Sequence, residues 1–131
     1  MLDHYRSARY QDGGRGESVG GVRHFDCYGL VRAVRSEHFG LPTMPALAHV
    51  RPSDSRQVHR SSSEAIKGLA ACDAVAGAIA LCWQGKIARH CGVVVPNNGR
   101  LGVLECHQTA GVRWQPLRKF CSEYTKVEFY T

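Results

Sequence analysis

The sequence predicts an α+β fold, in which N-terminal helices pack on an antiparallel β-sheet of about five strands. Two observations support this class: helical spacing of apolar residues in the first half of the chain, and short β-branched or aromatic runs separated by turn residues in the second half. Helices followed by strands are typical of α+β domains. A chain of 131 residues is the length of one domain, so residues 1–131 are expected to form a single unit.

The first 24 residues are predicted to form an irregular N-terminal arm. They are rich in glycine and arginine, and the pairs Gly13-Gly14 and Gly20-Gly21 are turn signals.

A helix is predicted from Asp26 to Phe39. Its apolar residues fall at positions 27, 30, 31 and 34, which lie on one face of a helix. The carboxylate of Asp26 is suited to cap the free amides of the first turn. Gly40 and Pro42 then end the helix.

A second helix is predicted from a capping box formed by Ser61 and Glu64, which precede the run AIKGLAAC. The preceding polar stretch, HVRPSDSRQVHRSS, is predicted to be a loop or broken helix. Within it, residues 49–63 are long enough to cover a cleft.

The strands are predicted from five runs. These are AGAIALCW, HCGVVV, RLGVLECH, GVRWQPL and KVEFY, and the turn compositions QGK, PNNG and QTAG lie between the first four. The segment PNNG is expected to form the tightest hairpin.

The composition limits the partners. Seventeen Lys and Arg against eleven Asp and Glu give a net charge of +6, which favours anionic partners. The basic residues form no run, which argues against nucleic acid, and no apolar stretch approaches the roughly 18 residues of a membrane-inserted helix.

The N-terminal residues have no signal-peptide core, so synthesis and retention in the cytoplasm are expected unless a carrier exports the protein. The six cysteines form no CxxC pair, which excludes a zinc ribbon or thioredoxin motif by spacing.

Cys27 is the candidate nucleophile. It lies in the first turn of the predicted helix, where free amides and the helix dipole stabilise a thiolate. It also shares the apolar helix face, so the alternative is an ordinary buried thiol.

A reactive thiol needs a base, and His90 at the start of HCGVVV is the candidate. The base needs an orienting partner, for which the run LECH offers Glu105 and His107 on one strand face. Strand alternation places His90 and His107 on one face and Cys91 and Cys106 on the other. This argues against a tetrahedral zinc site formed by these four residues, and it makes Cys91 and Cys106 core thiols.

These residues resemble a known family. The segment GGVRHFDCYGLVRAV is similar to the D-C-x-G-L/F-V motif of the NlpC-type cell-wall peptidases, which are small papain-like cysteine hydrolases. ARHCGVVV resembles the family's strand that carries the base, and GRLGVLECHQTAGV resembles the next strand, which carries the orienting residue. YQDGG, at residues 10–14, is similar to the family's Y-x-x-G-G.

The resemblance implies a papain-like NlpC-type fold and a thiol protease or amidase that needs no cofactor and no metal. Its substrates would be peptidoglycan stem peptides, cut at the γ-D-glutamyl–diamino acid bond. Cys27 would be the nucleophile and His90 the general base. His107 is the preferred orienting residue and Glu105 the alternative, which would be more like the related CHAP amidases. Tyr10 and the Cys27 backbone amide would bind the oxyanion.

Because these substrates carry carboxylates, a basic rim from residues such as Arg9 or Arg89 is expected. The motif most resembles peptidases of phage and prophage tails, which implies delivery to the periplasm or cell wall by a tail particle and contact with other tail proteins. Three alternatives remain: a type VI secretion amidase, a CHAP-like amidase, or a catalytically idle tail-assembly module of the same fold. Neither nucleic-acid binding nor membrane insertion is expected.

Overall fold

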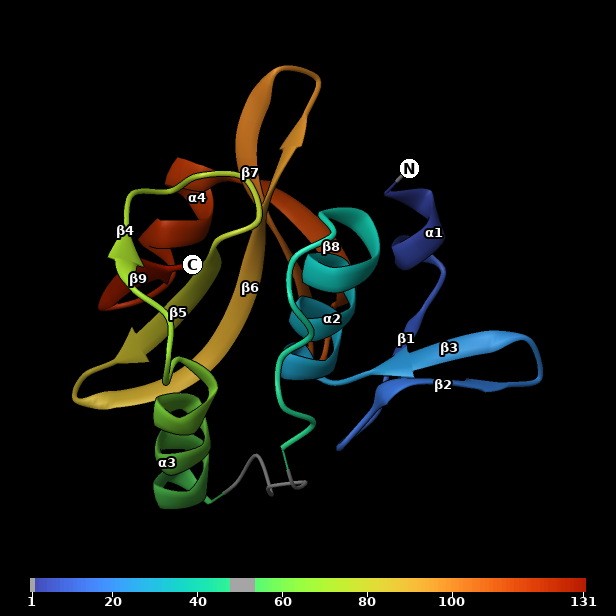
Figure 1. Cartoon of the computed structure of the whole chain (residues 1–131), viewed down its shortest axis with the longest axis horizontal. Coiled ribbons are helices and arrows are strands. Elements are labelled where there is room, and N and C mark those ends of the chain that lie inside the picture. Colours follow the sequence, from blue (N-terminus) through green and yellow to red (C-terminus); the bar gives the residue numbers. More distant parts are fainter. Residues whose placement is uncertain (1, 48–53) are drawn as a thin grey trace.

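A six-stranded sheet forms the centre of the protein in the computed structural model, which describes residues 2–47 and 54–131 (Figure 1). Its strand order is β4-β9-β5-β6-β7-β8, and every pair in it is antiparallel. The strands are β4 (Ala71–Cys72), β5 (Ile79–Gln84), β6 (Ile87–Asn97), β7 (Arg100–His107), β8 (Gly111–Pro116) and β9 (Lys126–Tyr130). The predicted α+β class is confirmed, and the five predicted runs correspond to β5–β9.

The turn between β6 and β7 is the tight hairpin predicted from PNNG. Asn97 pairs with Arg100, which leaves a two-residue connection. Asn98 and Gly99 both have positive φ, at 51° and 76°. Asn-Gly is the sequence that tolerates this pair of conformations best, so this local sequence fixes the register of the two longest strands.

The helix α2 (Cys27–Ala33) packs one of its faces on the sheet and continues as a π-helical turn, η1 (Val34–His38). Leu30, Val31 and Val34 are fully buried, in one cluster with Val93 and Val95 of β6. Burial of each such side chain stabilises the fold by about 1.5–3 kcal/mol. The predicted helix and its inward face are confirmed, and Gly40 follows it with a φ of 65°.

A short helix, α4 (Leu117–Ser122), covers the opposite face of the sheet. Its Phe120 is fully buried against Ala80, Cys82 and Val103. Helix α4 was not predicted from the sequence, because six residues with one buried aromatic side chain produce little helical periodicity.

The N-terminal segment is not an irregular arm. It contains α1 (Asp3–Arg6) and a small sheet of β1 (Arg9–Tyr10), β2 (Arg15–Val19) and β3 (Val22–Phe25) in the order β1-β3-β2. Gly20 and Gly21 form the tip of the β2–β3 hairpin, and both have positive φ. Figure 1 shows this hairpin projecting from one side of the molecule. The Gly20-Gly21 turn signal is therefore a hairpin signal, whereas Gly13-Gly14 lies in the connection between β1 and β2, which both pair with β3.

Helix α3 (Ser55–Ala65) lies largely upstream of the helix predicted from Ser61. The capping-box prediction is wrong, because Ser61 and Glu64 lie within α3, which ends at Ala65, and the run AIKGLAAC ends in β4. Asp54 is the N-cap of α3 and accepts a hydrogen bond from the amide of Gln57 at 3.1 Å. The hydroxyl of Ser62 donates to the Val58 carbonyl oxygen within the helix, at 2.8 Å. The predicted 49–63 loop is therefore helical from Ser55 onward, and its residues 49–53 lie outside the described part. None of the described helices is long and apolar enough to cross a membrane.

Candidate active site

Cys27 is the first residue of α2, directly after the N-cap Asp26. One oxygen of the Asp26 carboxylate accepts from the Gly29 amide at 2.7 Å, and the other lies 2.6 Å from the Arg15 guanidinium. Both Asp26 and Arg15 are largely buried. This anchored cap fixes where the helix begins, and therefore where the Cys27 backbone lies.

Gly29 is required by a close backbone approach. The Gly14 carbonyl oxygen accepts a hydrogen bond from the Asp26 amide at 3.0 Å. A Cβ at position 29 would lie 2.0 Å from that same oxygen. The glycine of the D-C-x-G motif thus admits the Gly13-Gly14 turn against the first turn of α2. The N-terminal segment therefore packs against the turn that carries Cys27.

The β6 and β7 strands separate next to this helix end. Their ladder runs from Asn97–Arg100 to Val93–Leu104. Beyond it, residues 90–92 of β6 pair with β5, whereas residues 105–107 of β7 pair with β8. The divergence lets His90 and the LECH segment face a common space without being ladder partners.

His90 contacts Glu105 in that space. The His90 Nε2 atom lies 2.8 Å from Glu105 Oε1. The Glu105 side chain is fully buried, and its second oxygen, Oε2, accepts from Arg113 Nε at 3.0 Å and from Gln115 Nε2 at 2.9 Å. Three donors therefore surround one carboxylate, and the ring of His90 is left with Nδ1 for any other partner.

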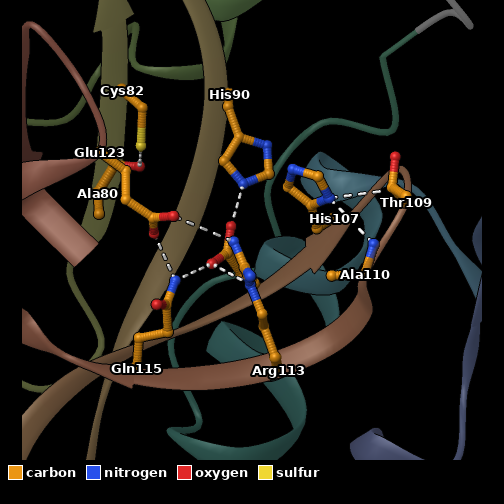
Figure 2. A network of polar contacts seen from close by, with 10 residues as sticks. Ala80, Cys82, His90, His107, Thr109, Ala110, Arg113, Gln115 and Glu123 are labelled. Carbon is orange, nitrogen blue, oxygen red and sulfur yellow. Dashed lines mark hydrogen bonds and ion pairs between the residues drawn. The ribbon is translucent and has the colours of Figure 1, made fainter. Parts of the chain in front are cut away.

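His107, the preferred orienting residue, does not have that contact. Its Nδ1 accepts hydrogen bonds from the backbone amides of Thr109 and Ala110, each at 3.1 Å. Figure 2 shows the two histidine rings next to one another, with the His107 contacts directed toward the β7–β8 turn. Glu105, and not His107, is therefore the residue in contact with His90, because the turn amides occupy Nδ1 of His107 and the buried Glu105 carboxylate lies against His90 Nε2.

The candidate residues line one cavity of 280 Å³. Cys27, His90 and His107 all border it, together with Tyr10. Helix α3 provides part of the wall through residues such as Val58 and Ser62. The described portion of the 49–63 segment is thus a side of the cavity.

The pKa values of Cys27 and His90 are shifted in opposite directions. Interaction with Cys91, and then with His90, holds the pKa of Cys27 well below its usual value, although burial opposes this. Burial by itself would lower the pKa of His90, but hydrogen bonding and charge from Cys27 and Glu105 raise it to about 9. These shifts favour a thiolate–imidazolium pair at neutral pH.

Tyr10 lies beside this pair. Burial, followed by its 2.9 Å hydrogen bond to Asp12, raises the pKa of the Tyr10 phenol, and the negative charge of Cys27 adds to the effect. The tyrosine therefore stays protonated, and its single O–H group donates to Asp12 in this structure.

The site contains further residues whose roles were not predicted from the sequence. Tyr124 stacks on the His90 ring with centroids 6.0 Å apart, and it borders the cavity. Arg113 and Gln115 hold Glu105 from β8, where alternation along GVRWQP places both on one face as the available signal. Cys91 is buried, as predicted, but it also borders the cavity and acts on Cys27.

The two arginines expected at the rim lie in different places. Arg89 borders the main cavity and donates to the Ser55 hydroxyl at 3.3 Å. Arg9 borders a second cavity of 440 Å³, which adjoins the first.

Neither the family models nor the curated proteins contain a match to this chain. The case for a function therefore depends on the geometry of the cavity. Across residues 2–47 and 54–131, no group of three or more His, Cys, Asp or Glu side chains is placed to hold a metal ion.

Proposed function

We propose that this protein is a cysteine hydrolase of the papain-like NlpC type that cleaves amide bonds in peptidoglycan stem peptides. One observation carries the proposal: Cys27, at a helix N-terminus, and His90 border one cavity, and His90 contacts the buried carboxylate of Glu105, which is the order thiol–histidine–carboxylate that nucleophilic catalysis requires. Cys27 is the nucleophile, His90 the acid and base, and Glu105 the orienting residue.

The first half of the reaction forms a thioester. The Cys27 thiolate attacks the carbonyl carbon, and the carbonyl electrons move to oxygen to give a tetrahedral oxyanion. The Cys27 backbone amide is the donor assigned to this oxyanion, and the Tyr10 hydroxyl joins it only by turning away from Asp12. As the C–N bond breaks, the His90 imidazolium gives its proton to the leaving amine.

The second half hydrolyses the thioester. His90, now neutral, takes a proton from water as the water attacks the acyl carbon, and the carboxylic acid leaves with return of the thiolate–imidazolium pair. Glu105 holds His90 Nε2–H throughout, so that Nδ1 is the nitrogen that exchanges protons with Cys27, amine and water.

The proposed substrate bond is γ-D-glutamyl–diamino acid, and the proposed setting is a phage or prophage tail that delivers the enzyme to the cell wall. Both come from the resemblance of the HFDCYGLVR segment. The net charge of +6 and Arg89 at the cavity suit a substrate that carries carboxylates.

A CHAP-like amidase is the second candidate, and the identity of the orienting residue favours it. A carboxylate on His90 is more like the CHAP amidases than the imidazole expected in the NlpC type. The two candidates share every catalytic step and differ in the bond cut.

Mass spectrometry of muropeptides tests both candidates. Purified sacculi are incubated with the protein, with Cys27→Ala, and with Cys121→Ala, in which a partly exposed free thiol outside the cavity is removed as the matched control. Products with a new diamino-acid amine support the first candidate, and products cut elsewhere in the stem or crossbridge support the second. Release of the same products by Cys27→Ala would refute hydrolysis at this site, and a tail-assembly module would then be the better explanation.

A further inference from the structure

The His107 ring presents a donor to the cavity. A neutral imidazole carries one ring proton, and Nδ1 of His107 accepts two backbone amide hydrogens. The proton is therefore on Nε2. Because His107 borders the cavity that contains Cys27, a substrate in that cavity can reach this side of the ring.

The position of the His107 ring determines whether it contacts the acyl half or the amine half of the substrate. The His107 and His90 ring centroids are 6.1 Å apart, with the planes at 71°. In the proposed reaction His90 protonates the leaving amine, so that nitrogen must lie against the His90 ring. Groups attached to the amine are then the ones within reach of His107.

A second cavity continues the space on this side. Residues 6–10 and 108–112 line it, and it shares Tyr10, Gln108 and Thr109 with the first cavity. Arg9 supplies positive charge there, as does Arg6, which also lies 3.7 Å from the Asp3 carboxylate. The space beyond His107 is thus polar and basic, which suits an oxygen-bearing anionic group better than an acyl chain.

We propose that His107 and this second cavity form the subsite for the amine half of the substrate, which is an α-amino acid or its peptide. The Nε2–H group of His107 donates to the carboxylate or carbonyl oxygen next to the scissile nitrogen, and the chain beyond it enters the basic cavity. This inference rests on the proposed function and adds to it a specificity-determining residue.

A purely structural role for His107 makes a different prediction. If the ring only caps the β7–β8 turn, an acceptor at the Nδ1 position is all that is needed. His107→Asn supplies that acceptor through Oδ1 but has no donor at the Nε2 position. His59→Asn is the matched control, because His59 Nδ1 also accepts a backbone amide, from Ala88 at 3.2 Å, and His59 does not border either cavity.

Two synthetic substrates with the same scissile bond provide the test. One is L-Ala-γ-D-Glu-L-Lys, and the other is the amide of L-Ala-γ-D-Glu with 1,5-diaminopentane, which lacks only the lysine carboxylate. We expect the unmodified protein to have a kcat/KM roughly tenfold or more higher for the tripeptide, the size of one hydrogen bond to a charged group. His107→Asn should lose that preference, with the tripeptide value falling and the diaminopentane value unchanged, and His59→Asn should keep both values.

Equal cleavage of the two substrates by the unmodified protein would overturn the inference, even if the His107 variant did not fold. An equal loss on both substrates in His107→Asn would also overturn it, since the residue would then act on the reaction and not on the amine half. Both of these results leave the proposed function intact. Failure of the unmodified protein to cut either substrate or sacculi refutes the proposed function, and the inference with it.

Discussion

Replacement of Glu105 by glutamine is expected to abolish most of the activity by moving a proton on His90. In the protein, one carboxylate oxygen faces two donors, Arg113 and Gln115, and the other faces only His90. The single oxygen of the glutamine amide will therefore face the two donors, and its NH₂ group will face His90 Nε2. That nitrogen must then accept, so the ring proton moves to Nδ1, where it blocks proton transfer from Cys27.

The charge effect adds to the tautomer effect. The pKa of His90 is raised from 6.5 to about 9, a difference of about 3 kcal/mol in favour of the imidazolium. Cys27 and Glu105 both contribute to this stabilisation, so loss of the Glu105 charge lowers the equilibrium constant for the ion pair. With the misplaced proton, we expect kcat/KM for Glu105→Gln to fall roughly 100-fold or more.

Amine release from the stem tripeptide measures the activity, and long-range ¹H–¹⁵N NMR of the His90 ring reports which nitrogen is protonated. Glu128→Gln is the matched control, since it makes the same change on β9 at a carboxylate that lies 4.0 Å from Lys126, outside the cavity. A Glu105→Gln protein that keeps full activity while His107→Ala loses it would refute the reasoning. So would a His90 Nε2 that remains protonated in the variant.

Three further predictions concern ionisation and stability. The pKa of Cys27 is lowered and the imidazolium of His90 persists to about pH 9, so the rate of Cys27 alkylation by iodoacetamide should be nearly equal at pH 7 and pH 8.5. The alkylation rate of an ordinary thiol rises more than tenfold over that range. Such a rise for Cys27 would contradict the ion pair. Gly29→Ala should lower the free energy of unfolding by about 3 kcal/mol in urea, since its Cβ would lie 2.0 Å from the Gly14 oxygen; an unchanged midpoint would show that the turn can move away. Asp54→Ala should destabilise the protein by about 1 kcal/mol through loss of the cap on the Gln57 amide, and thermal melts that match the unmodified protein would mean that α3 does not depend on this cap.

Much of the fold was predictable because its signals are local. The spacing of Leu30, Val31 and Val34 defined the buried face of α2, and the Asn98-Gly99 pair defined the β6–β7 hairpin. The N-terminal sheet was missed because β1 has two residues and pairs in parallel with β3 across a sequence gap. The sequences of β2 (RGESV) and β3 (VRHF) also show no alternation of apolar and polar residues, which is the signal that predicts a strand.

The residues of the candidate site could be predicted from helical and strand periodicity, but not all of their contacts. Helical phase and strand alternation selected Cys27, His90, Glu105 and His107, and all four lie at or beside the cavity. Alternation could not choose between Glu105 and His107, because both are on one face of β7. The choice depends on the divergence of β6 and β7 and on the turn amides that occupy His107, and these are tertiary features with no local signal.

The position of β9 determines when the sheet can be completed during synthesis. This strand, at residues 126–130, lies between β4 and β5 and is hydrogen-bonded to both, with Tyr130 paired to Ala71 on one side and to Ile79 on the other. Until it emerges from the ribosome, β5 has an open edge. The cavity residues from the first quarter of the chain must also wait for those of the last quarter. The nascent polypeptide therefore completes this sheet only after β9 has been translated, and a chain without β9 would present the β5 edge for pairing with another strand.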